Sequence, residues 1–229
     1  MHDMLKPDEI WDDLQCKGLG IIRNARGFAY GQDAVLLANY LCAKKSEAVL
    51  DMCAGGGIIA ILAAAKTGAS FVGVELQAEL CDMARRSVER NAQADSVEII
   101  NGDIRTLHKT LGYGVFDAAC CNPPYYPGGT VSQNTVKRLS IHQDECTMAD
   151  VAQCAARMLK NGGRFYMVYP VSRMAESFHA LVQNGIQPKK LVLVRAKRNE
   201  APYLFMTEAK KGAGAGLIMQ DMITIEEDA

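Results

Sequence analysis

The chain has 229 residues, of which 49% are hydrophobic and 22% charged, as in an ordinary globular protein with one large domain. It holds no run of roughly 20 apolar residues that would cross a bilayer, and its polar N-terminus does not resemble a secretory leader, so we expect a cytoplasmic protein with no membrane partner. A formal net charge of −1 excludes a protein that binds polyanions through bulk charge alone, although basic residues gather near the C-terminus.

The eight cysteines contain no C-x-x-C pair, which argues against a zinc or redox motif. We expect reduced thiols that serve as small buried hydrophobes, and no metal site. Cys120 and Cys121 are adjacent in an apolar run typical of a strand, so their side chains should point to opposite faces of a sheet.

Hydrophobic periodicity predicts alternating helices and strands along most of the chain. The expected order is helix 33–41, strand 49–52, helix 58–66, strand 71–74, helix 78–91, strand 97–100, strand 115–121, helix 148–159, strand 164–168, helix 172–184, strand 191–195 and strand 203–208. Thr147 is a candidate N-cap for the helix that follows it. The helix at 33–41 could cover the ligand crevice or pack on the sheet edge.

This alternation predicts an α/β fold with a doubly wound, mainly parallel sheet of seven strands. The last strand should be antiparallel, because the linker before it is too short for the crossover that a parallel pair needs. We expect a single domain over residues 1–229. Within it, residues 1–45 would form an N-terminal extension and helix, residues 46–211 the core, and residues 212–229 a flexible loop and tail.

The first three core strands end in residues suited to an adenosine-containing ligand. Asp51 and the glycines at 55–57 follow the first strand, and glycines let the backbone approach a ligand closely. Glu75 ends the second strand, where a carboxylate can accept both ribose hydroxyls, and Asp103 after the third can accept the adenine amine.

The Gly-x-Gly-x-x-Gly spacing of a phosphate cradle is absent, which favours S-adenosylmethionine over a dinucleotide. Asp51 would suit the ammonium group of that cofactor, directly or through water. A structural role for Asp51 or Glu75, such as capping a helix, stays open.

The fourth core strand ends in Asn122-Pro123-Pro124-Tyr125. An exocyclic amino nitrogen conjugated to a ring is a poor nucleophile until acceptors hold its two hydrogens. The Asn122 side-chain oxygen and the Pro123 carbonyl can be those acceptors, the prolines stiffen the turn, and Tyr125 offers a ring for stacking a flipped-out base. The motif predicts methylation of a planar amino group.

Together, Asp51-x-x-x-Gly55-x-Gly57, Glu75, Asp103 and Asn122 to Tyr125 resemble the class I amino-methyltransferases of DNA, RNA and protein. Three segments further resemble the bacterial valine-tRNA adenosine-37 N6-methyltransferases: residues 27–37, 73–77 and 141–143. The resemblance covers essentially the whole chain and implies a Rossmann-like fold, S-adenosylmethionine as cofactor and tRNA as partner. The chain departs from the family pattern at Cys53, where glycine is usual, and at Gln143, where an acid is common.

These patterns assign candidate residues to three roles. Catalysis is assigned to Asn122, Pro123, Pro124 and Tyr125. Cofactor binding is assigned to Asp51, Cys53, Gly55, Gly57, Glu75, Leu76, Asp103, Ile104 and Asn122. Substrate binding is assigned to Tyr125, Tyr126, Lys137, Arg138, His142, Arg195, Lys197 and Arg198, with His142 also open to a packing role in its loop.

The sequence leaves three functions open. The first is N6-methylation of adenosine in tRNA, at position 37 of valine tRNA by resemblance. The second keeps the chemistry on a protein glutamine amide or on DNA adenine. The third is a cofactor-binding and RNA-binding module without catalysis, for which Cys53 is the only support. The sequence indicates no oligomeric state, and a monomer is compatible with it.

Overall fold

The computed structural model describes residues 4–26, 31–124 and 146–226. Its elements in chain order are β1 (Glu9–Cys16), β2 (Leu19–Asn24), α1 (Gln32–Tyr40), β3 (Ala48–Met52), α2 (Ile58–Thr67), β4 (Ser70–Glu75), α3 (Ala78–Arg90), β5 (Val97–Asn101), α4 (His108–Leu111), β6 (Phe116–Cys121), α6 (Met148–Met158), β7 (Leu159–Pro170), the 3-10 helix η1 (Val171–Arg173), α7 (Met174–Gln183), β8 (Ile186–Arg195), β9 (Leu204–Lys211), β10 (Ile218–Met219) and β11 (Ile223–Thr224).

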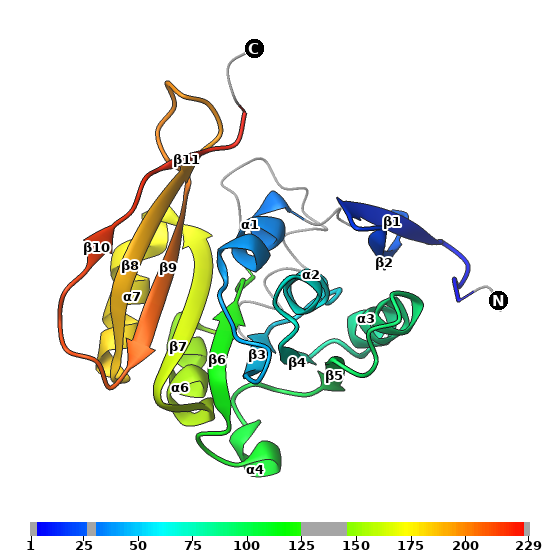
Figure 1. The fold of residues 1–229 in the computed structure, drawn as a ribbon, viewed down its shortest axis with the longest axis horizontal. Coiled ribbons are helices and arrows are strands. Elements are labelled where there is room, and N and C mark those ends of the chain that lie inside the picture. The colour runs from blue at the N-terminus through cyan, green and yellow to red at the C-terminus, as the bar shows by residue number, and fades with distance from the viewer. Residues whose placement is uncertain (1–3, 27–30, 125–145, 227–229) are drawn as a thin grey trace.

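One large sheet holds every strand from β3 onward, in the order β10-β8-β9-β7-β6-β3-β4-β5, with β11 also paired to β8 (Figure 1). Neighbouring strands from β5 to β7 pair in parallel, and β9 is antiparallel to both β7 and β8. The predicted doubly wound, mainly parallel sheet with an antiparallel strand is therefore confirmed. The short β10 and β11, which both pair in parallel with β8, were not predicted.

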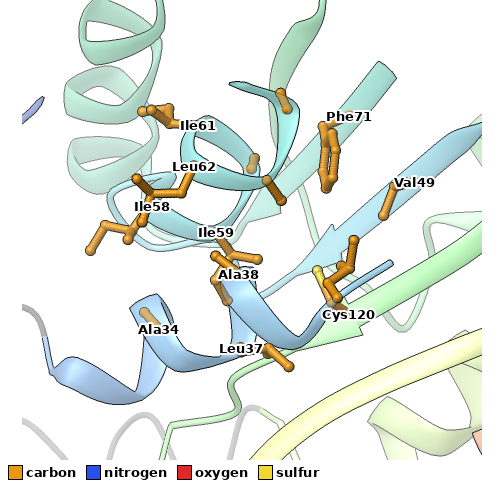
Figure 2. Close-up of a cluster of buried hydrophobic side chains, with 14 of the residues drawn as sticks. Ala34, Leu37, Ala38, Val49, Ile58, Ile59, Ile61, Leu62, Phe71 and Cys120 are labelled. Carbon is orange, nitrogen blue, oxygen red and sulfur yellow. The ribbon is translucent and has the colours of Figure 1, made fainter. Parts of the chain in front are cut away.

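Side chains of the central strands alternate between two apolar layers, as a period of two requires. Val49 and Cys120 pack on one face with α1, α2 and α3, whereas Leu50 and Cys121 pack on the other face with α6 and α7. Figure 2 shows part of the first layer, where Ala38 of α1 lies close to Ile59 of α2. The expected opposite orientation of Cys120 and Cys121 is confirmed.

The strand β7 is longer than predicted because it begins before the glycines that were expected to separate it from α6. Phe116 of β6 pairs with Leu159, and Ala118 pairs with Arg164, so residues 160–163 bulge out of the ladder. Gly162 takes a φ of 77° within this bulge. The glycines therefore do interrupt the strand pairing, as predicted, but β7 pairs with β6 both before and after the bulge.

The N-terminal hairpin β1–β2 forms a separate two-stranded sheet that was not predicted from the sequence. It packs against α3, where the backbone amide of Ile22 donates to Ser87 Oγ at 2.8 Å and Asn91 bonds both backbone groups of Gly20. Arg86 of α3 also forms an ion pair with Glu9 at 2.6 Å. The hairpin thus covers α3 through polar contacts that sequence periodicity does not reveal.

No helix among the described residues combines the length and apolar character needed to cross a membrane.

Thr147 begins α6 with a capping box, which confirms the predicted N-cap. Its hydroxyl accepts the Asp150 amide, and the Asp150 carboxylate accepts the Thr147 amide at 2.9 Å. We expect Thr147→Ala to lower the free energy of unfolding by about 1 kcal/mol, seen as a drop in melting temperature of about 2–4 °C. Thr147→Ser keeps the hydroxyl and should match the wild type. Equal melting temperatures for the alanine and serine variants would contradict this role.

Candidate active site

The carboxyl ends of β3, β4, β5 and β6 border a cavity of about 280 Å³. Its lining residues are Cys53, Gly55, Val74, Glu75, Leu76, Gln77, Leu80, Gly102, Asp103, Ile104, Asn122, Pro124 and Cys146. Parallel sheets bind ligands at this edge, because the strand ends and the turns after them converge there. Of the residues predicted to hold the cofactor, all except Asp51 and Gly57 line the cavity.

The glycine turn between β3 and α2 requires left-handed backbone at three positions. Cys53, Gly55 and Gly57 have φ values of 60°, 54° and 81°. A Cβ built on Gly55 would meet no atom within 4 Å, whereas one on Gly57 would lie 3.4 Å from Ala84 Cβ in α3. Gly55 therefore presents bare backbone to open space in the cavity, and Gly57 begins α2 with a left-handed φ that favours glycine.

The Glu75 carboxylate is buried and fixed by two backbone amides. Its Oε2 accepts the Gly55 amide at 2.8 Å, and its Oε1 accepts the Gln77 amide at 2.9 Å. Glu75 thus ties the glycine turn to the start of α3. Each carboxylate oxygen has a second lone pair, so both can also accept a ligand hydroxyl. The structural and binding roles considered for Glu75 are therefore compatible.

Asp103 lines the cavity, but its carboxylate is already paired with Arg105. The Arg105 side chain lies 2.6 Å from Asp103 Oδ2, and the Arg105 amide donates to Oδ1 at 2.8 Å. Hydrogen bonds from Arg105 lower the pKa of Asp103. An adenine amine at this position would share the carboxylate with Arg105, a contact that the sequence prediction did not include.

Asn122 and Pro124 line the cavity at the end of β6. The nitrogen and the oxygen of the Asn122 side-chain amide lie in different surroundings. Its Nδ2 donates to Asp33 Oδ2 of α1 at 3.1 Å. Its Oδ1 is buried, and none of the residues that the structure describes donates a hydrogen bond to it. The Asn-Pro-Pro turn therefore begins with a cavity-lining residue whose side-chain oxygen accepts no hydrogen bond from the described residues.

Asp51 is fully buried under the glycine turn and does not line the cavity. The Cys120 thiol donates to its Oδ1 at 3.6 Å, while its Oδ2 receives no hydrogen bond from any described residue. Burial raises the pKa of Asp51 to about 7. The predicted contact of Asp51 with the cofactor ammonium would run through water rather than directly, because Asp51 is fully buried and does not line the cavity.

Cys146 joins the cavity although no sequence pattern indicated it. Its Sγ lies 4.0 Å from Cys53 Sγ, and both thiols line the cavity. The hydrogen bond between them and burial raise the pKa of Cys146, which keeps its thiol protonated. Val74, Gln77, Leu80 and Gly102 were also missed, although the first two belong to the family-like segment 73–77 and flank Glu75.

The basic C-terminal residues divide between the two edges of the sheet. Arg195 ends β8 at the edge that carries the cavity, and the exposed Lys197 and Arg198 follow it. Lys210 and Lys211 end the antiparallel β9 at the opposite edge, where Lys211 pairs with Ile186. The predicted substrate residues Tyr125, Tyr126, Lys137, Arg138 and His142 lie outside the described residues, as does Gln143.

The opposite edge of the sheet carries a more open hollow of about 550 Å³. Its walls include Tyr113, Arg157, Lys160 and Lys211. None of the predicted site residues that the structure describes lines it. The smaller cavity is therefore the one that gathers the predicted chemistry.

The raised pKa of Asp51 predicts an unusual pH dependence of stability. From about pH 4 to about pH 7 the folded protein binds a proton on Asp51 that the unfolded chain releases, so this contribution to the free energy of unfolding falls as pH rises. Asp103 and Asp117 have lowered pKa values and act in the opposite direction.

Urea unfolding of the wild type and of Asp51→Asn at a series of pH values isolates the Asp51 contribution. The stability of the wild type relative to the variant should decline across this range and then level off. A difference that stays constant with pH would show that Asp51 is ionised throughout.

Cys53 occupies a backbone conformation that disfavours any side chain. We expect Cys53→Gly to be more stable than Cys53→Ala by about 1 kcal/mol, because both remove the thiol and only glycine removes the strain. The measurement is the difference in free energy of unfolding between the two variants. Ala54→Gly is the matched control and should lose stability, since Ala54 is not in this conformation. Equal stability of the two Cys53 variants would mean that the turn relaxes.

Comparisons with known proteins identify the family of the chain. A family model described as the methyltransferase small domain matches residues 30–186. Two curated relatives are named tRNA1(Val) (adenine(37)-N6)-methyltransferase. The relative from Shewanella sp. (strain W3-18-1) is 25% identical over 77% of this chain and 70% of its own length. The relative from Bacteroides fragilis (strain YCH46) is 23% identical over 75% of this chain and 73% of its own.

Solved structures agree on the fold. A protein described as a predicted O-methyltransferase from Agrobacterium tumefaciens has a TM-score of 0.68 at 22% identity, covering 84% of this chain and 86% of its own. Geranyl diphosphate C-methyltransferase from Streptomyces coelicolor has a TM-score of 0.58 at 16% identity, covering 78% and 76%.

The family resemblance and fold class predicted from the sequence are confirmed, as are the enzyme class and the cofactor, since the family is one of S-adenosylmethionine-dependent methyltransferases. Because the family model covers more than half of the chain, the chain belongs to the methyltransferase small domain family.

Proposed function

We propose that this chain transfers a methyl group from S-adenosylmethionine to the exocyclic N6 of adenosine in tRNA, at position 37 of a valine tRNA. The observation that carries the proposal is the buried, unpaired Oδ1 of Asn122 at the cofactor cavity. Leaving a buried acceptor without a donor costs roughly 1–3 kcal/mol, so its retention favours a ligand that donates to it. An amino group is such a ligand.

The cavity fits the cofactor. Glu75 keeps a lone pair on each oxygen for ribose hydroxyls, and the bare backbone at Gly55 leaves room where a Cβ would intrude. Leu76, Ile104 and Leu80 supply apolar walls for an adenine ring, and Asp103 supplies an acceptor. We assign cofactor binding to Cys53, Gly55, Glu75, Leu76, Asp103 and Ile104 in direct contact, with Asn122 in the cavity wall beside the transferred methyl group and with Asp51 and Gly57 supporting the turn.

S-adenosylmethionine, when bound, supplies a methyl group activated by its positive sulfur. The protein aligns the acceptor nitrogen with that methyl group and makes the nitrogen more nucleophilic. Asn122 Oδ1 accepts one amino hydrogen and the Pro123 carbonyl accepts the other, which withdraws the nitrogen lone pair from the ring. Tyr125 is assigned to stack on the flipped-out base, and the extra proton leaves to water after transfer.

The names of the curated relatives support tRNA as the substrate. The strand β8 ends at Arg195, and Lys197 and Arg198 follow it, at the edge of the sheet that carries the cavity. This places three basic side chains on the side of the sheet where the phosphates of a bound RNA would lie. Lys137, Arg138, Tyr126 and His142 are assigned to the same interface from the sequence alone. We further propose that residues 1–229 act as one cytoplasmic domain.

Asn122→Ala tests the function directly. We expect methyl transfer to tRNA to fall at least about 100-fold, because loss of a single aimed hydrogen-bonding group in an active site has that effect. Binding of S-adenosylhomocysteine, measured by calorimetry, should stay near the wild-type value. Asn161→Ala is the matched control, since Asn161 lies at the opposite edge of the sheet. Lost binding of S-adenosylhomocysteine would show that Asn122 holds the cofactor rather than the amino group.

The substrate is identified by offering labelled S-adenosylmethionine with tRNA from cells that lack this protein, with duplex DNA, or with glutamine-containing protein. Digestion of the tRNA should yield labelled N6-methyladenosine, and valine tRNA should carry it. Label in DNA or protein and none in tRNA would contradict the proposal and favour the corresponding alternative. Cofactor binding without transfer to any substrate would favour a non-catalytic module.

A further inference from the structure

The two ends of the Asn122 side-chain amide lie in different surroundings. Nδ2 donates to Asp33 Oδ2 at 3.1 Å, while the buried Oδ1 has no donor among the described residues. An ionised carboxylate can only accept hydrogen bonds, so the amide group must face it with its nitrogen. A flipped Asn122 would place its oxygen against the Asp33 carboxylate and its nitrogen where Oδ1 now lies, facing the amino group to be methylated.

We propose that Asp33 is a positioning residue that fixes this amide in its productive orientation, an inference that rests on the proposed function. A flipped Asn122 would offer a donor to a group that itself donates, so the hydrogen bond on which the proposed chemistry depends would be lost. Asp33 prevents that flip without touching the acceptor nitrogen. Its charge also polarises the amide and makes Oδ1 a stronger acceptor.

The Asp33 carboxylate is itself held in place. Its Oδ1 accepts the Ala34 amide at 2.9 Å, at the start of α1. A Cβ built on Gly31 would lie 2.1 Å from the same oxygen, so only glycine at 31 leaves the carboxylate its position. The conformation of Asp33 is therefore set by the chain on both sides of it.

The helix that carries Asp33 is anchored to the core. Leu37 and Ala38 of α1 are buried in the apolar layer shared with α2 (Figure 2). Asp33 and Asn122 are 89 residues apart in sequence, and their contact joins the first turn of α1 to the end of β6. The packing of α1 thus fixes the position of Asp33, and Asp33 in turn fixes the orientation of the Asn122 amide on which the proposed chemistry depends.

Asp33→Ala is the first test. We expect kcat for tRNA methylation to fall about 10- to 100-fold, the loss expected for one hydrogen bond to a charged group. The dissociation constant of S-adenosylhomocysteine should not change. Glu176→Ala is the matched control, since it also removes a carboxylate from the first turn of a helix and should keep wild-type kcat. In the Asn122→Ala background, Asp33→Ala should cause no further loss, because the two residues act as a unit.

Gly31→Ala is a second variant that retains the carboxylate but displaces it. It should lower kcat in the same direction as Asp33→Ala. Gly214→Ala is its control, because a Cβ there meets no atom within 4 Å. Melting temperatures of all variants show whether they fold.

The side-chain amide signal of Asn122 in an NMR spectrum gives a readout that needs no activity. The signal is identified by its loss in Asn122→Ala, and it should shift in Asp33→Ala and Gly31→Ala but not in the two controls. An unshifted signal in Asp33→Ala would overturn the contact, and a shifted signal with wild-type kcat would overturn the positioning role.

A failure of the proposed function can be distinguished from a failure of the positioning role of Asp33. Wild-type protein that methylates none of the offered substrates would remove the function, and with it the positioning role. The amide signals would still report whether Asp33 holds Asn122. Wild-type methylation that Asp33→Ala leaves intact would overturn this inference alone.

Discussion

The burial of strands β3 and β6 between two helical layers is the constraint on which the rest of the structure depends. From Val49 to Met52 and from Ala118 to Cys121 every residue is fully buried, so neither strand offers a face to water. Such strands are stable only with helices on both sides, which requires parallel pairing and crossover helices. Parallel pairing in turn brings the carboxyl ends of β3, β4, β5 and β6 to one edge (Figure 1), where the cavity forms.

The elements with strong periodicity could be predicted from the sequence, because burial alone determines them. The strands 49–52 and 97–100 and the helix 78–91 match the observed elements to within a residue or so at each end. The cavity residues at strand ends were predictable for the same reason, since parallel topology fixes where Glu75, Asp103 and Asn122 converge. The hairpin β1–β2 was not, because its position depends on side-chain bonds from Ser87 and Asn91 that leave no pattern in the sequence.

Side-chain contacts limited the rest of the site prediction. The Arg105 side chain folds back on Asp103, and Cys146 lines the cavity beside Cys53, from which it is far removed in sequence. The basic residues near the C-terminus form one group in sequence, but antiparallel pairing of β8 and β9 sends Arg195 and Lys211 to opposite edges. The spacing of residues along the chain does not show which side chains lie close together, whereas the strand order and register of the sheet do.

Three departures from ordinary local rules lie at this edge of the sheet. Cys53 has a positive φ, Asp51 has a buried carboxyl oxygen without a described donor, and Asn122 has a buried acceptor without one. Each of these costs free energy in the folded protein, and the apolar layers on both sides of β3 offset that cost. Natural sequences keep such costs where function needs them. The acceptor of Asn122 costs stability only while no donor reaches it, so binding of an amino group would recover that energy at the place where methyl transfer occurs.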